Sequence, residues 1–136
     1  MTGICSYTLY IKTRFEILKK IRDEMDFRDL DALHAAHDLL IEIHDISQSF
    51  PADDQFTLGD AICSTALEIP ATLAEGCGQN NDCALKRSIS RAMALTCRIE
   101  YFILVAGQLG IVDEESLADL TRLIEALQME LNKHSI

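Results

Sequence analysis

Hydrophobic residues recur every three or four positions along most of the chain, as in amphipathic α-helices, and no segment alternates as a strand does. Four segments carry this period strongly: about residues 28–49, 53–75, 82–109 and 113–133. A weaker candidate, about residues 7–25, has apolar residues seven positions apart: Ile4, Ile11, Leu18 and Met25. The pattern therefore predicts an all-α protein with four helices. Residues 1–26 form either an extra N-terminal helix or an extension that packs weakly, and Met25 is a candidate natural start.

Proline and acidic residues mark the boundary between the first two predicted helices. Phe50 precedes Pro51, and the residue before a proline avoids the α-helical region, so the first helix should end there. Asp53 or Asp54 should then start the second helix, because the exposed N–H groups of a helix N-terminus stabilise a carboxylate. Pro70 lies inside the second helix and should bend it, since proline lacks the backbone N–H and crowds the preceding turn.

Glycines and polar residues mark the later boundaries. Gly76 and Gly78 should end the second helix, since glycine readily adopts the left-handed conformation common at a helix C-terminus. Gly110 should end the third helix, and the acidic run that begins at Asp113 should start the fourth. The loop and cap before the third helix come from three consecutive polar residues: Asn80, Asn81 and Asp82. Such short connections make consecutive helices antiparallel, so residues 27–134 should form one up-and-down four-helix bundle.

The predicted helices differ in how many apolar faces they carry. The second helix has one, formed by Leu58, Ile62, Ala66, Ile69 and Leu73. The first helix has two stripes, one formed by Leu30, Leu33, His37, Leu40 and His44, the other by Leu39, Ile43, Ile46 and Phe50. Two stripes are more than a small monomeric bundle needs, which leaves the second available to cover a neighbouring subunit.

The formal net charge is −10, and it is concentrated in the middle of the chain. Residues 27–80 contain one Lys or Arg against ten Asp or Glu, whereas residues 81–136 contain six against eight. Because the phosphate backbone attracts positive surfaces, this balance argues against a protein whose whole surface binds nucleic acid. The acidic middle suits a basic protein partner or simply solubility.

Five cysteines occur without a CxxC pair or a secretory signal, which indicates reduced thiols in a cytoplasmic protein. No apolar run approaches the ~20 residues that cross a bilayer, so no membrane association is expected. Four of the cysteines belong to the region of the two middle helices: Cys63, Cys77, Cys83 and Cys97. If these cysteines were close together in the fold, they could form a thiolate site. We interpret them instead as small residues of the core.

Basic residues on the third helix are the sharpest candidates for binding. Arg87, Arg91 and Arg98 are spaced i, i+4 and i+11, which places them on one helical face with Lys86 adjacent in sequence. This face is a candidate phosphate-binding surface. The alternative is that the arginines pair with carboxylates, the candidates being Glu68, Asp60 and Glu100. No aromatic residue for base stacking is evident beside them.

Other polar residues give weaker indications of chemistry. A metal site would draw on the first helix, from His34, His37, His44, Asp31 and Asp38. No metal-ligand motif is present there, and histidines at these positions also fit a partly buried stripe. Glu75 and Glu100 are candidate acid–base carboxylates, but no nucleophile or oxyanion donor accompanies them. We therefore predict no metal, no cofactor and no catalytic residues, and a protein that is not an enzyme.

Short motifs between residues 27 and 134 resemble a known family in their order and spacing: FRDL at 27–30, FP at 50–51, IPATLAEGCG at 69–78 and LG at 109–110. The family comprises the four-helix-bundle proteins encoded in intervening sequences of bacterial 23S ribosomal RNA genes. FTLG at 56–59 resembles the related accessory variability determinant proteins of diversity-generating retroelements. The single residues that carry the resemblance are Phe50, Pro51, Gly59, Pro70, Glu75, Gly76, Gly78, Glu100 and Gly110.

The resemblance implies a bundle that assembles as a ring-like homopentamer with no established activity. It also implies a nucleic-acid role, because the similar retroelement proteins bind nucleic acid and a reverse transcriptase through positive surfaces. The chain departs from the family on the second helix. Positions that usually hold Gln, two basic residues, Ser and Asn are here Ala61, Cys63, Ser64, Glu68 and Thr72.

Two functions fit these observations. The first is a non-catalytic oligomeric scaffold or binding module for RNA, or for a ribonucleoprotein or reverse-transcriptase partner, with the third-helix basic residues in contact. The second is an acidic oligomeric adaptor that binds a basic protein and has no nucleic-acid role. The net −9 of residues 27–80 favours the second, and the arginine face favours the first.

Overall fold

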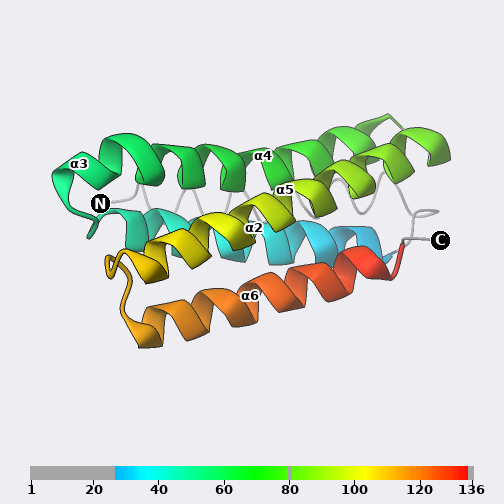
Figure 1. Cartoon of the computed structure of the whole chain (residues 1–136). Helices are drawn as coiled ribbons and strands as arrows, with labels where there is room; N and C mark the ends of the chain where they lie inside the picture. The colour runs from blue at the N-terminus through cyan, green and yellow to red at the C-terminus, as the bar shows by residue number, and fades with distance from the viewer. Residues whose placement is uncertain (1–26, 80, 135–136) are drawn as a thin grey trace, which may run out of the picture.

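The computed structural model describes residues 27–79 and 81–134, and these residues form helices and loops with no strand (Figure 1). The four long helices are α2 (Phe27–Ser47), α4 (Asp60–Gly78), α5 (Asp82–Gln108) and α6 (Glu114–Asn132). Consecutive long helices run in opposite directions, which confirms the predicted up-and-down bundle (Figure 1). The N-terminal helix predicted at residues 7–25 lies outside the described residues.

Each long helix packs against two neighbours, because α4 and α6 each contact both α2 and α5. The largest fully buried side chains are almost all aliphatic: Leu39, Ile43, Ile69, Leu95, Ile99, Leu120, Ile124, Leu127, Leu131 and Thr96. Removing such apolar surface from water contributes about 25 cal/mol per Å², so this core supplies most of the driving force for folding. Within the described residues, no helix is long and apolar enough to cross a bilayer.

The two apolar stripes of α2 both follow from its place in the bundle. Leu39, Ile43 and Phe50, which belong to the second stripe, are buried in the core of this chain. The expectation that this stripe is available to a neighbouring subunit is therefore wrong. In the first stripe His37 is half-buried and His44 is exposed. A helix that faces two neighbours needs a wide apolar surface, which the two stripes together provide.

The connection from α2 to α4 is helical from Ala52 onward. Pro51 precedes the single turn α3 (Ala52–Asp54), and the π-helical segment η1 (Gln55–Gly59) leads directly into α4. The helix starts at Ala52, one residue before the predicted Asp53, and Pro51 occupies the cap without a side-chain capping bond. Asp53 and Asp54 lie in the first turn instead, where the helix dipole still favours carboxylates.

The start of this segment is anchored to the end of α2. The Gln55 amide donates hydrogen bonds to the carbonyl oxygens of Phe50, at 2.7 Å, and Gln48, at 3.1 Å. Gly59 is buried, and a Cβ atom there would lie 3.5 Å from the Phe50 ring. Pro70 lies inside α4 as predicted, and α4 continues without a break through it. Whether α4 bends at Pro70 stays a prediction.

Gly76 has a different role from the one its position near a helix end suggests. The helix does end at Gly78 as predicted. Among the described glycines only Gly110 has a positive φ, so the left-handed conformation predicted for Gly76 and Gly78 is wrong. Gly76 is buried in the last turn of α4, and a Cβ atom there would lie 2.5 Å from the Ser88 Cβ and closer still to its Oγ. Glycine at this position therefore permits α4 and α5 to approach closely.

Gly110 does end α5 as predicted. Its φ is 73°, and its backbone N–H donates to the Gly107 carbonyl at 3.1 Å. The next N–H, of Ile111, donates to the Ala106 carbonyl at 3.2 Å. These two bonds form a Schellman motif, which satisfies carbonyl groups that a helix end leaves without partners.

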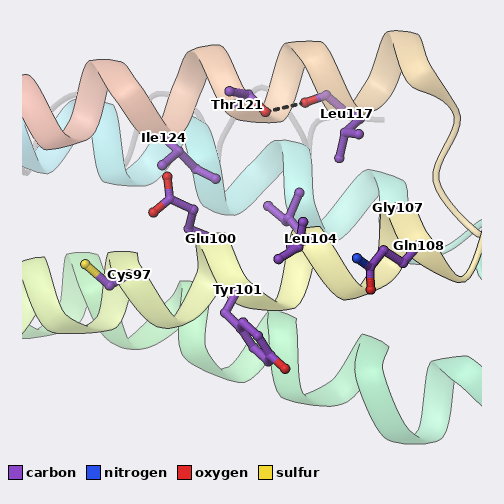
Figure 2. A pocket seen from close by; sticks show the side chains of 10 residues that line it. Cys97, Glu100, Tyr101, Leu104, Gly107, Gln108, Leu117, Thr121 and Ile124 are labelled. Carbon is purple, nitrogen blue, oxygen red and sulfur yellow. Dashed lines mark hydrogen bonds between the residues drawn. The ribbon is translucent and has the colours of Figure 1, made fainter.

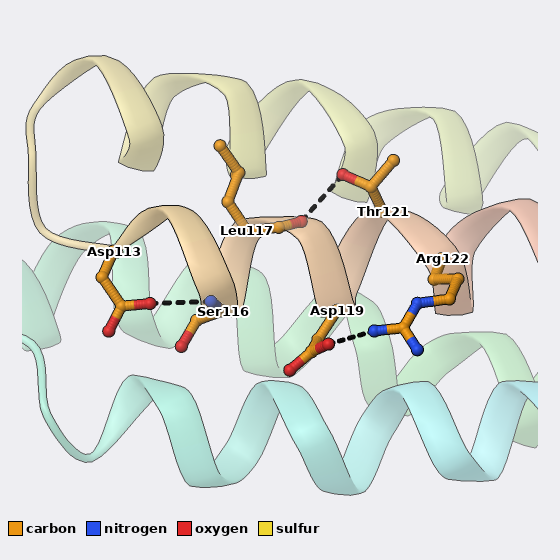
Figure 3. A network of polar contacts seen from close by, with 6 residues as sticks. All are labelled: Asp113, Ser116, Leu117, Asp119, Thr121 and Arg122. Atoms are coloured by element: carbon orange, nitrogen blue, oxygen red, sulfur yellow. Dashed lines mark hydrogen bonds and ion pairs between the residues drawn. The ribbon is translucent and has the colours of Figure 1, made fainter.

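Side-chain caps start α5 and α6. The Asn81 side chain accepts from the N–H groups of Cys83, at 2.8 Å, and Ala84, at 3.3 Å. Asp113 accepts from the Ser116 N–H at 2.7 Å (Figure 3). That hydrogen bond lowers the pKa of Asp113, because it stabilises the ionised carboxylate. Asn81 and the acidic run thus cap as predicted, while Asn80 lies outside the described residues.

The close approach of α4 and α5 makes a testable prediction at Gly76. Gly76→Ala should lower the free energy of unfolding by about 1–3 kcal/mol, because the added methyl overlaps Ser88 and one helix must shift. The measurement is chemical denaturation followed by circular dichroism. Gly78→Ala is the matched control: nothing lies within 4 Å of a Cβ there, so no loss is expected.

A second substitution at Ser88 tests whether the overlap is the cause. In a Ser88→Gly background, Gly76→Ala should cost much less, because the Ser88 Cβ that it meets is gone. A Ser88→Ala background should give little relief, since that Cβ remains. Equal costs of Gly76→Ala in all three backgrounds would contradict the packing role of Gly76.

Candidate nucleic-acid interface on helix α5

The basic residues predicted for binding all lie on the solvent side of α5. Its opposite face is held in the core by Ala84, Ile89, Ala92, Leu95, Thr96, Ile99, Ile103 and Ala106. Lys86, Arg87, Arg91 and Arg98 are all exposed. With 3.6 residues per turn, the three arginines point within about 40° of one another around the helix axis. The structure therefore brings the arginines together as the spacing predicts.

Arg91 is paired across the α4–α5 contact. Its guanidinium lies 3.1 Å from the Glu68 carboxylate, and the two side chains are 53% and 48% exposed. Pairing with Glu68 was one of the two alternatives open from the sequence, and for Arg91 it is confirmed. An ion pair this exposed contributes little to stability, because water and salt screen both charges.

The other basic residues of this face have no such partner. Among the described residues, Arg87, Arg98 and Lys86 form no ion pair, and neither Asp60 nor Glu100 pairs with an arginine of α5. These three cations are directed to solvent on a helix that is rigidly packed on its other side. They are available to an anion that the described part of the chain does not supply.

A groove of about 620 Å³ runs between α5 and α6 (Figure 2). Its lining residues are Cys97, Glu100, Tyr101, Ile103, Leu104, Gly107, Gln108, Leu117, Thr121 and Ile124. Figure 2 shows Glu100 pointing from α5 toward α6, whereas the Tyr101 ring extends from α5 away from α6. Glu100 therefore lies on a different side of α5 from Tyr101.

The two carboxylates considered as an acid–base pair lie far apart along the bundle. Glu75 adjoins Gly76, which meets Ser88 of α5, and Glu100 lies twelve residues beyond Ser88. At 1.5 Å per residue this separation is about 18 Å along the helix, too far for one proton-transfer site. Both carboxylates are exposed.

The histidines and cysteines also do not gather into a site. Within the described part of the chain, no group of three His, Cys, Asp or Glu residues is placed to hold a metal ion. His34, His37 and His44 range from half-buried to exposed along α2. The four cysteines of residues 27–134 form no disulfide with one another.

The interpretation of these cysteines as core residues is correct for only some of them. Cys77 is buried, and half-buried Cys63 donates to the Ser47 hydroxyl at 3.2 Å. Cys83 and Cys97 are exposed, so for them the interpretation is wrong. Neither lies on the apolar stripe that turns α5 toward the core.

Tyr101 is the residue of this surface that sequence reasoning missed. Its side chain is 62% exposed and lies three residues after Arg98. The statement that no aromatic residue accompanies the arginines is therefore wrong. The position of Tyr101 could have been predicted from its spacing. It lies fourteen residues after Arg87, which is almost four helical turns, so the two residues are on the same side of α5.

Many exposed acidic residues lie on the other elements. Exposed aspartates occur along α2, α3 and the start of α4: Asp31, Asp38, Asp45, Asp53 and Asp60. None of them forms an ion pair with another described residue. The chain thus carries an acidic surface and, on α5, a local basic one.

Comparison with known proteins identifies a relationship over most of the chain. The sequence model of the family described as 23S rRNA-intervening sequence protein matches residues 28–133. No curated protein matches the chain. The family match confirms the first resemblance and covers nearly all of the described bundle. The likeness to accessory variability determinant proteins stays a prediction.

The exposed ion pair predicts a small energetic coupling between α4 and α5. Glu68→Gln should change the free energy of unfolding by less than about 1 kcal/mol. A double-mutant cycle with Arg91→Gln, measured by urea denaturation, should give a coupling of about 0.2–1 kcal/mol that shrinks as salt is added. A coupling well above this range, insensitive to salt, would show that Arg91 is committed to Glu68.

Proposed function

The chain belongs to the 23S rRNA-intervening sequence protein family, and on that premise we propose that it is a non-catalytic binding module for RNA. In this proposal α5 supplies the contact surface through Lys86, Arg87, Arg91 and Arg98. The partner is RNA itself or a protein that carries it, such as a ribonucleoprotein or a reverse transcriptase. The rest of the bundle acts as a scaffold that holds this surface rigid.

One observation carries the proposal: Arg87 and Arg98 lie on one exposed face without an ion pair among the described residues. The chain has a net charge of −10, yet these two arginines have no carboxylate partner among the described residues. Arginines in this state favour binding of an external anion. Arginine suits phosphate, because its planar guanidinium can donate two parallel hydrogen bonds to phosphate oxygens.

The Arg91–Glu68 ion pair is compatible with this role. A surface ion pair contributes at most about 1 kcal/mol, so a phosphate can replace the Glu68 carboxylate at small cost. Arg91 would then join Arg87 one turn away, and the two would bind adjacent phosphates. In the absence of RNA, Arg91 pairs with Glu68 at the surface.

We further propose that the chain assembles with copies of itself as a homopentamer in the cytoplasm. Several large apolar side chains are exposed on the long helices: Ile41, Leu67, Leu104 and Met129. Burying such groups against other subunits would remove apolar surface from water. A ring would also repeat the α5 surface in each subunit and raise the affinity for a long RNA through multivalency.

The acidic surface supports one alternative, an oligomeric adaptor for a basic protein. Its exposed aspartates on α2 to α4 lie apart from the arginines of α5. An adaptor of this kind binds through α2 to α4 and ignores changes on α5. Variants of α5 therefore separate the two functions.

The double variant Arg87→Glu/Arg91→Glu tests the role of α5 in RNA binding. Its affinity for a short fluorescein-labelled oligouridine, measured by fluorescence anisotropy, should fall at least about tenfold, because two phosphate contacts become repulsive. Wild-type affinity should also fall steeply between about 50 and 200 mM salt. Thermal melts establish that the variant is folded.

A matched control makes the same charge change elsewhere. Arg122→Glu/Lys133→Glu alters two exposed cations, one on α6 and one directly after its end. Arg122 borders a groove that also includes Glu42 of α2. Figure 3 shows Arg122 beside Asp119. This control should bind RNA nearly as wild type does. RNA binding that is equal in wild type and both variants, or absent in wild type, would contradict the proposed role of α5.

The proposed pentamer can be tested by the mass of the assembly in solution. Light scattering from the purified protein should give roughly five times the 15.2 kDa of one chain. Leu67→Glu and Leu104→Glu should shift the protein toward smaller species, because a charge cannot be buried against another subunit without cost. A wild-type monomer would overturn the pentamer while leaving RNA binding by a single chain to be judged on its own assay.

A further inference from the structure

Tyr101 presents an aromatic ring to solvent on the helix that carries the arginines. The side chain is 62% exposed, although tyrosine could bury most of its area in a core. Figure 2 shows the ring extending from α5 on the side away from α6, while the neighbouring Glu100 carboxylate points toward α6. The ring face is therefore not covered by the acidic residue next to it in sequence.

The position of Tyr101 continues the arginine surface. Arg98 lies one helical turn before it, and residues three apart on a helix have Cβ atoms about 5–6 Å from one another. Arg87, Arg91, Arg98 and Tyr101 thus follow one another along about 21 Å of one side of α5.

This order of groups matches the repeating chemistry of a nucleotide. Guanidinium groups bind phosphates, and an exposed aromatic ring stacks on the face of a base. In a duplex, base faces are covered by their neighbours, so a side chain on a convex helix can stack only on an unpaired base. Arg98 and Tyr101 are close enough to hold the phosphate and the base of one nucleotide.

We propose that Tyr101 stacks on an unpaired base and that the α5 surface therefore binds single-stranded RNA in preference to duplex RNA. This inference rests on the proposed function and specifies its ligand. Other described aromatic residues are less suitable: Phe50 is buried and Phe102 is half-buried. Phe56 is exposed, but it lies on η1 rather than on α5, which makes it a control.

The test compares Tyr101→Leu, Tyr101→Phe and Phe56→Leu on two probes, a labelled oligouridine and an RNA duplex of equal length. Stacking of one base contributes about 1–3 kcal/mol, so Tyr101→Leu should weaken oligouridine binding between about 5-fold and 150-fold. Tyr101→Phe keeps the ring and should bind within about twofold of wild type. Phe56→Leu should bind as wild type does, and duplex affinity should be weak and unchanged by all three substitutions.

A spectroscopic readout distinguishes stacking from a structural effect. The chain has no tryptophan and three tyrosines, so its intrinsic fluorescence reports on tyrosine. Oligouridine should quench this fluorescence in the wild type, and the quenching should be largely lost in Tyr101→Leu even at saturating RNA.

The outcomes separate this inference from the proposed function. If Tyr101→Leu binds oligouridine as tightly as wild type while Arg87→Glu/Arg91→Glu does not bind, stacking is overturned and the RNA module stands. If wild type binds duplex as tightly as oligouridine, the preference for single strands is overturned. If wild type binds neither probe, both the proposed function and this inference fail.

Discussion

The close approach of α4 to α5 at Gly76 is the constraint on which the surface chemistry depends. With no Cβ at Gly76, the end of α4 lies directly against Ser88 of α5. Because helices are rigid, this one contact restrains the whole α4–α5 pair, which is the most extensive helix contact of the bundle. About two turns before Gly76, Glu68 then reaches Arg91, and the remaining basic residues of α5 are left facing solvent.

The burial of α5 explains why a basic surface persists on an acidic chain. Its aliphatic side chains are locked in the core, so the arginines on the opposite side cannot turn inward or move to the carboxylates of α2. The aspartates are spread along α2, α3 and the start of α4. The positions of charged residues around each helix therefore decide which surfaces are positive and which are negative. The net charge of the chain does not describe what each surface attracts.

Features that depend on neighbours in sequence were predictable, whereas features that depend on neighbours in space were not. The four helices, the Asn81 and Asp113 caps and the left-handed Gly110 follow from local periodicity and turn chemistry. Gly76 was misread because a glycine near a helix end has two explanations, backbone conformation and close packing, and only the facing Ser88 decides between them. The arginine face was predictable for the same reason as the helices, but the Glu68 partner of Arg91 depends on how α4 and α5 pack. The position of Tyr101 on the arginine side of α5 could also have been predicted from its spacing, and the structure adds that the residue is 62% exposed.

The central claim is that the solvent side of α5, from Lys86 to Tyr101, is where this family member contacts RNA. The most direct test is photocrosslinking of the wild-type protein to an oligonucleotide containing 4-thiouridine, followed by mass spectrometry of the crosslinked peptides. The account predicts crosslinks concentrated on α5, with Tyr101 among the modified residues. Crosslinks confined to α2 or α6, with none on α5, would contradict it.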